Sequence, residues 1–216
     1  MNRSDLTAAS SRDPRAVSPA APLAGIYAFE GLTPVVDPTA WIHPTAVLIG
    51  DVIVEADCYV GPGAVMRGDF GRIVLMRGAN LQDNCVVHSR PDIDCVMEED
   101  SHIGHGAIIH ACHIGRDTLI GMNAVVMDLA RVGEQTIVAA MSFVKIGAAV
   151  PPRTLVAGIP AREVRALTPA DLERKQAGTR MYQELARRCH AGLRPAAPLT
   201  TVEPDRVRSA WPGYGY

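Results

Sequence analysis

Histidines are the residues of this chain most able to do chemistry, and four of the seven lie in one segment: His102, His105, His110 and His113. Imidazole nitrogen is a common zinc ligand, at about 2.0–2.1 Å from the metal. Three histidines and a water form the arrangement in which zinc lowers the pKa of that water to about 7. The candidates for such a set are His88, His105 and His110. Spacing alone equally allows histidines that only decorate a surface.

An aliphatic repeat with a period of six surrounds these histidines. Its positions are Ile42, Leu48, Val54, Val60 and Met66 in a first block, and Ile114, Ile120, Val126, Val132, Val138 and Val144 in a second. Six matches neither the helical period nor simple strand alternation. It is typical of β-solenoids, in which three units of strand and corner form a triangular coil of about eighteen residues. We therefore expect an all-β solenoid whose coils stack at roughly 4.8 Å. Between residues 67 and 100 the register slips.

The repeat limits how the histidines can be combined. Five residues of strand span at most roughly 16 Å, and less around a corner. His105 and His110 should therefore lie on different faces of one prism, and they can bind the same ion only if a second subunit supplies one of them. A trimer with metals at its subunit interfaces satisfies this geometry.

Composition shifts divide the chain into four parts. Residues 1–22 are poor in apolar side chains, which predicts a disordered N-terminal extension. Residues 23–160 carry the repeat, residues 161–192 form a C-terminal helical segment, and residues 193–216 form a Pro-rich tail. Within the third part we expect a helix over about 169–190, with Thr168 as its N-cap and Pro169 at its first position.

The net charge, the cysteine pattern and the length of the apolar runs exclude several classes of function. The formal net charge of the 216 residues is −2, so neither a nucleic acid nor an anionic membrane is an expected partner. The five cysteines are dispersed and contain no CxxC pair, which argues against a disulfide framework. No apolar run approaches the length of a membrane span or a signal peptide. We expect a cytoplasmic protein.

Several motifs resemble a known family. RGD at 67–69, NLQDN at 80–84, His88 and HGxxxH at 105–110 occur in the order found in γ-class carbonic anhydrases. More closely, RGDFGRI, NLQDNCVVH, HIGHGAIIH, IGMNAVVMD and GIPAR resemble the PaaY family of phenylacetic acid degradation and its relatives in carnitine metabolism. The resemblance covers about residues 26–190. It implies a left-handed parallel β-helix (hexapeptide repeats, triangular prism) followed by a C-terminal α-helix.

The same resemblance implies a metal site. His88 and His110 of one subunit and His105 of the next would bind Zn²⁺, or alternatively Fe²⁺ or Co²⁺, in a homotrimer. His102 and His113 match no ligand position, and surface or supporting roles are expected for them.

Four further residues receive roles from the resemblance. Arg67 and Asp69 would form an interface ion pair that fixes the trimer, with Arg67 near the metal pocket. Gln82 would orient a metal-bound hydroxide, and Asn80 would shape the same edge. Corner capping is the alternative for Gln82 and Asn80, because amide side chains also stabilise solenoid turns. Phe70 stands where the archetypal carbonic anhydrase has a glutamate, which suits a pocket for something larger than CO2.

Four functions are compatible with these residues. The first is a metal-hydroxide enzyme that hydrolyses acyl-CoA thioesters in phenylacetate-type catabolism, and the second is carbonic anhydrase, which hydrates CO2 reversibly to bicarbonate. The third is a hexapeptide acyltransferase that uses a histidine as general base. The fourth is a non-catalytic accessory trimer.

Overall fold

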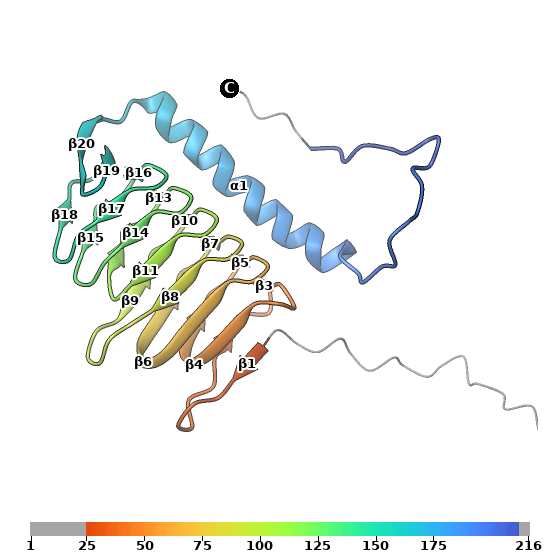
Figure 1. The fold of residues 1–216 in the computed structure, drawn as a ribbon, viewed down its shortest axis with the longest axis horizontal. Helices are drawn as coiled ribbons and strands as arrows, with labels where there is room; N and C mark the ends of the chain where they lie inside the picture. Colours follow the sequence, from red (N-terminus) through yellow and green to blue (C-terminus); the bar gives the residue numbers. More distant parts are fainter. Residues whose placement is uncertain (1–24, 212–216) are drawn as a thin grey trace, which may run out of the picture.

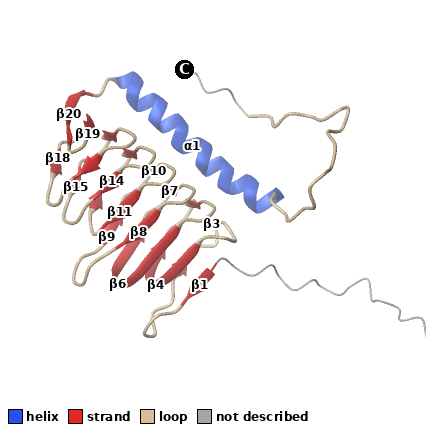
Figure 2. Ribbon diagram, viewed as in Figure 1, coloured by secondary structure: helices blue, strands red, loops and turns tan. Residues whose placement is uncertain are grey.

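A computed structural model describes residues 25–211 as a parallel β-helix with one long helix along its side (Figure 1, Figure 2). The extension expected over residues 1–22 lies outside the described range, as do residues 212–216 of the tail. Strands stack coil upon coil along the axis of the prism, and all their pairings are parallel except that of the last two strands. The prism has three faces.

Face 1 carries β1 (Gly25–Tyr27), the first halves of β4 (Val47–Val54) and β6 (Val65–Leu75), β8 (Val86–His88), β11 (Ile108–His110), β14 (Val125–Val126) and β17 (Phe143–Val144). Face 2 carries β2 (Val35–Val36), the second halves of β4 and β6, β9 (Cys95–Met97), β12 (His113–Ile114), β15 (Arg131–Val132) and β18 (Ala149–Val150). Face 3 carries β3 (Trp41–Ile42), β5 (Tyr59–Val60), β7 (Asn80–Leu81), β10 (His102–Ile103), β13 (Leu119–Ile120), β16 (Ile137–Val138), β19 (Thr154–Gly158) and β20 (Ala161–Ala166).

The six-residue repeat builds the core as predicted. On face 3, Leu119 pairs with Ile137 and Ile137 with Leu155, so each of these coils holds eighteen residues. The repeat positions point into the prism: Leu48, Val54, Val60, Met66, Ile114, Ile120, Val126, Val132, Val138 and Val144 are all buried. Only Ile42, in the first block, is partly exposed. The prediction of a β-solenoid is confirmed.

The slip in the repeat has a structural cause. On face 1, Val65 pairs with Val86 and Val86 with Ile108, which are twenty-one and twenty-two residues apart. The additional residues lie at the corner between faces 1 and 2, in segments 69–72 and 89–94 of successive coils. Face 1 itself stays in register, and the corner protrudes beside the ends of β8 and β11.

The helix α1 (Pro169–Gly192) starts where its capping residues predict. Thr168 is the N-cap, its side chain accepts a hydrogen bond from the Asp171 N–H, and the Asp171 carboxylate accepts one in return from the Thr168 N–H. Residues 161–166 had been expected in the helical segment, yet they form β20, which pairs antiparallel with β19 and covers the open edge of face 3. The helix, which is the one helix of the described range, is not apolar enough to cross a membrane.

Apolar packing and polar contacts hold α1 against the prism. Tyr182, Leu185 and Ala186 pack on Trp41 and Tyr59 of face 3. Nearer the helix N-terminus, the buried Lys175 ammonium donates hydrogen bonds to the Asp117 carboxylate at 2.6 Å and to the Asp100 carbonyl at 2.5 Å. The helix is thereby fixed over face 3.

Candidate functional site

His88 and His110 lie side by side at the ends of β8 and β11 on face 1, where they are paired in register. Nδ1 of His88 is 3.1 Å from Nε2 of His110. The outer nitrogen of each ring contacts a carboxylate: His88 Nε2 lies 3.1 Å from Asp69 Oδ1, and His110 Nδ1 lies 3.0 Å from Asp128 Oδ2. The two rings therefore face each other with an acid behind each.

The carboxylates determine where the ring protons lie. An ionised carboxylate can only accept, so the outer nitrogens carry protons, and the facing nitrogens are the ones placed to bind a cation. Two nitrogen ligands of a tetrahedral zinc ion lie roughly 3.3 Å apart, and the distance here is 3.1 Å. Histidine ligands of metals are usually held by such carboxylates. The pair fits two ligands of one metal ion.

The electrostatics of this pair favour a neutral His88 ring and charged acids. Burial is the main cause that lowers the pKa of His88, Arg67 acts in the same direction, and Asp69 opposes them. Burial alone would raise the pKa of Asp69 and Asp128, but their hydrogen bonds outweigh it and hold both values below the usual one. A neutral imidazole beside an ionised carboxylate is the state that a cation needs.

Arg67 and Asp69 form an ion pair within one chain, with 2.8 Å between Nη1 and Oδ2. Asp69 thus bridges Arg67 and His88, while the Arg67 side chain remains 44% exposed. The participation of this pair in a subunit interface stays a prediction. Phe70, in the protruding corner, places its ring 5.2 Å from the His88 ring and forms an apolar wall beside it.

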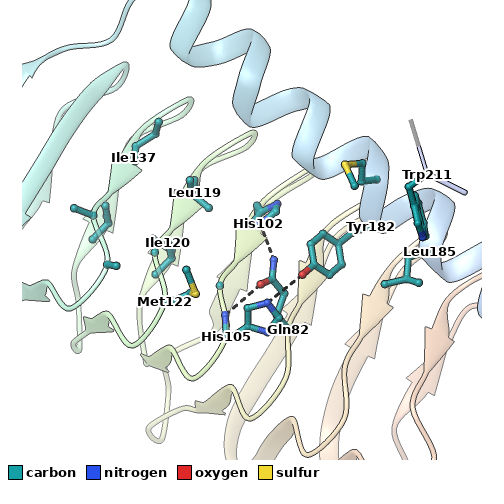
Figure 3. Close-up of a pocket in the computed structure, with 16 residues that line it drawn as sticks. Gln82, His102, His105, Leu119, Ile120, Met122, Ile137, Tyr182, Leu185 and Trp211 are labelled. Carbon is teal, nitrogen blue, oxygen red and sulfur yellow. Dashed lines mark hydrogen bonds between the residues drawn. The ribbon is translucent and has the colours of Figure 1, made fainter. Parts of the chain in front are cut away.

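Gln82, Asn80 and His105 meet on the other side of the prism, under α1, and Figure 3 shows Gln82 and His105 there. The Gln82 amide accepts a hydrogen bond from the His105 N–H at 3.2 Å through Oε1, and its Nε2 donates to Asn80 Oδ1 at 3.0 Å. The His105 ring lies between Tyr182 Oη, 3.2 Å from Nε2, and Asp83 Oδ2, 3.3 Å from Nδ1. Asn80 and Gln82 are buried, so their amides belong to this cluster and not to an exposed corner.

His102, for which the sequence predicts a surface or supporting role, is part of this cluster. Its Nε2 lies 2.6 Å from the Gln82 amide nitrogen, and its ring is edge-on to Tyr182. Burial, with smaller effects of Lys175 and His105, lowers the pKa of His102 to about 3, so the ring is neutral. Strand register is the sequence signal that could have placed His102 in this cluster, because His102 occupies the outward position above Asn80 in the next coil.

A groove of about 830 Å³ opens beside this cluster, between α1 and face 3 (Figure 3). Its walls are mainly apolar and include Leu119, Met122, Ile137, Met181, Leu185 and Trp211. Its polar end is formed by Gln82, His102 and His105.

The predicted site residues therefore fall into two groups in one chain. We call His88, His110, Arg67 and Asp69 the face 1 half-site, and His105, Gln82 and Asn80 the face 3 half-site. His105 follows β10 at the corner between faces 3 and 1 and contacts α1, so it does not join His88 and His110. Within residues 25–211, no group of three or more His, Cys, Asp or Glu residues is placed to hold a metal ion.

Comparison with known proteins shows the family. The chain is 55% identical over 183 residues to the carnitine operon protein CaiE of Proteus sp. (strain LE138), covering 85% of this chain and 93% of that protein. For CaiE of Escherichia coli (strain K12), the identity is 54% over 182 residues, with coverages of 84% and 93%. No family model matches.

Two solved structures share the fold. A Bacillus cereus protein provisionally assigned as an acetyltransferase has a TM-score of 0.76 and 32% identity, covering 77% of this chain and 96% of its own. A hexapeptide transferase family protein from Anaplasma phagocytophilum has a TM-score of 0.73 and 36% identity, covering 75% and 96%.

These findings define a hexapeptide-repeat protein with a left-handed parallel β-helix. Within that class, the chain belongs to the family of the carnitine operon protein CaiE. The motifs predict a closer resemblance to PaaY, whereas the relatives found here are named CaiE. They give no support to phenylacetate catabolism.

Proposed function

We propose that this protein is a homotrimeric, metal-dependent enzyme that hydrolyses acyl-CoA thioesters. The observation that carries the proposal is the His88–His110 pair, whose facing nitrogens lie 3.1 Å apart with a carboxylate behind each ring. A divalent cation placed between these nitrogens would bind both rings. The relatives' name, carnitine operon protein, supports an acyl substrate from carnitine-type metabolism over one from phenylacetate degradation.

A second copy of the chain would supply the third ligand, His105. Face 1 presents a column of outward apolar side chains in register: Val47, Val65, Val86, Ile108, Val125 and Phe143. Val86 and Ile108 are each 41% exposed. The groove beside His105 is also apolar. Joining these two surfaces in a closed ring of three would bring the face 3 half-site of one copy to the face 1 half-site of its neighbour.

The residues present suit hydrolysis of a thioester. A zinc ion bound by His88, His110 and His105 would lower the pKa of water to about 7 and polarise a carbonyl; Fe²⁺ or Co²⁺ suits the same imidazole ligands. Water adds its oxygen to the acyl carbon, the C–S bond breaks, and the thiol leaves with a proton. Asp69 and Asp128 hold the ligand rings in one tautomer, and Arg67 places a positive charge at the rim.

An acyltransferase is the second candidate, and the contact between His105 and Asp83 favours it. Asp83 Oδ2 lies 3.3 Å from His105 Nδ1, an arrangement that makes the other ring nitrogen a general base. The similar structures from B. cereus and A. phagocytophilum carry transferase names. Such an enzyme would need His105 but not His88. Reversible CO2 hydration would need both half-sites, and an accessory trimer would need neither.

Metal content and activity of three variants separate these functions. We expect about one divalent metal per chain in the purified wild type, measured by mass spectrometry. His88→Ala and His105→Ala should each lose this metal. His113→Ala is the matched control, because His113 also contacts an acid, Glu98 at 2.8 Å, but lies on face 2. Hydrolysis of a panel of acyl-CoAs should fall with the metal and return when zinc is added.

Each contrary result selects another function. Activity that survives chelation and His88→Ala but not His105→Ala would establish the acyltransferase. CO2 hydration faster than hydrolysis of every thioester tested would establish carbonic anhydrase. A metal-containing trimer without either activity would leave the accessory role.

A further inference from the structure

The Gln82 amide contacts Asn80, His102 and His105, and the backbone N–H of His105 assigns its orientation. The His105 N–H can only donate, and it lies 3.2 Å from one end of the Gln82 amide. That end must be the carbonyl oxygen, because an amide NH2 facing an N–H would place two donors together. The other end, which contacts Asn80 and His102, is therefore the NH2 group.

The orientation of Gln82 in turn assigns the tautomer of His102. One amide hydrogen goes to Asn80 Oδ1 at 3.0 Å, and the second points to His102 Nε2 at 2.6 Å. His102 Nε2 must accept, so the neutral ring carries its proton on Nδ1. Nδ1 is buried and has no hydrogen-bond partner in the described part of the chain, a costly condition that is concentrated at functional sites.

We propose that His102 is a positioning residue that, together with Asn80, occupies both N–H groups of Gln82 and leaves it only an acceptor lone pair for the reacting group. This rests on the proposed function, in which Gln82 enters the neighbour's metal site with His105. The Gln82 oxygen has a second lone pair beyond the bond to His105. Gln82 can thus hold the attacking water by its hydrogen, but it cannot donate to the thioester carbonyl.

The experiment compares His102→Leu, which removes the acceptor, with His102→Gln, whose amide oxygen can replace Nε2. For His102→Leu we expect kcat to fall on the order of ten-fold, the effect of one lost orienting hydrogen bond, with KM and metal content unchanged. His102→Gln should recover most of the loss. His113→Leu is the control, because His113 has the equivalent outward position on face 2.

A double-mutant cycle tests whether His102 acts through Gln82. In a Gln82→Ala background, His102→Leu should have no further effect on kcat; additive losses would show that His102 acts elsewhere and would overturn the proposal. A wild-type kcat in His102→Leu would do the same.

A readout without catalysis keeps the proposal testable if the proposed function fails. Nitrogen-15 NMR of the wild-type protein should show His102 with its proton on Nδ1 and both Gln82 amide protons slowed in exchange. A proton on Nε2 would refute the hydrogen-bond assignment whatever the enzyme does. Absence of metal and of thioesterase activity, with the expected tautomer, would instead refute only the proposed function.

Discussion

The acids behind the proposed ligand histidines are as informative as the histidines themselves. Asp128 lies 3.0 Å from His110; it ends the IGMNAVVMD motif, but the sequence alone assigns it no role. Because an ionised carboxylate fixes the tautomer of the ring and raises its basicity, Asp128 should contribute to metal affinity without touching the metal.

Asp128→Asn tests this contribution. The amide oxygen can still accept from His110, but the negative charge is lost, so we expect metal affinity to fall about 10–100-fold, measured by competition with a chromogenic chelator. Glu98→Gln removes the charge beside His113 in the same way and should leave the affinity unchanged. Equal affinities of Asp128→Asn and the wild type would show that the contact does not orient a ligand.

The face 3 half-site lies on β7 and the turn after β10, and α1 covers it; a buried ion pair helps to fix the helix there. The Lys175 side chain is 1% exposed and that of Asp117 is 10% exposed. Burial lowers the pKa of Lys175 although Asp117 opposes it. For Asp117, burial acts to raise the pKa, but hydrogen bonds from Lys175 and Gln176 outweigh it and lower the value. The ion pair favours the charged form of both groups, and burial outweighs it only for Lys175.

Lys175→Met should therefore lower the free energy of unfolding by on the order of 3 kcal/mol, because it leaves a buried carboxylate without its cation. Urea unfolding with circular dichroism measures this loss. The exposed Lys145→Met is the control. Lys175→Met combined with Asp117→Asn should recover part of the loss, since asparagine tolerates the φ of 53° at residue 117.

The same pair predicts a pH dependence. The folded pKa of Asp117 lies below its unfolded value of about 3.9. Its contribution to stability is therefore present above that pH and is lost as the pH falls through the folded pKa. Lys175→Met should reduce this acid sensitivity, and an unchanged pH profile of unfolding would exclude the ion pair as its source.

Structural features that repeat along the chain can be predicted from the sequence. Features that depend on a single contact between residues far apart in the chain cannot. The buried aliphatic at every sixth position predicted the coil, because each unit obeys the same packing rule. Nothing repeats in the Lys175–Asp117 contact, which joins residues 58 positions apart. The strand β20 lies in the segment expected to be helical, and it is a strand because the open edge of the preceding β19 pairs with it.

The candidate site was predictable as a set of residues but not as an arrangement. Motif order singled out His88, His105 and His110, and strand length indicated that they could not all meet in one chain. Only the structure shows that Gln82 and Asn80 accompany His105, and that His102 joins them beneath α1.

On the scale of the whole molecule, the proposed trimer would make each chain an incomplete unit of function. If each site takes His88 and His110 from one chain and His105 from the next, a defect in one half-site leaves the other half of that chain usable. Two inactive variants can then be complementary when they share a ring.

Co-expression of His88→Ala and His105→Ala tests this. Each alone should be inactive, whereas about one site in four of a random equal mixture combines an intact half-site from each chain and should restore that share of activity and bound metal. His88→Ala with His110→Ala is the control, because both defects lie in the same half-site and no mixed ring repairs it. Absence of restored activity in the first mixture would place the whole site within one chain. In genetic terms, two recessive null alleles of this gene should complement each other, and the pairs that do so would map which residues face each other across the interface.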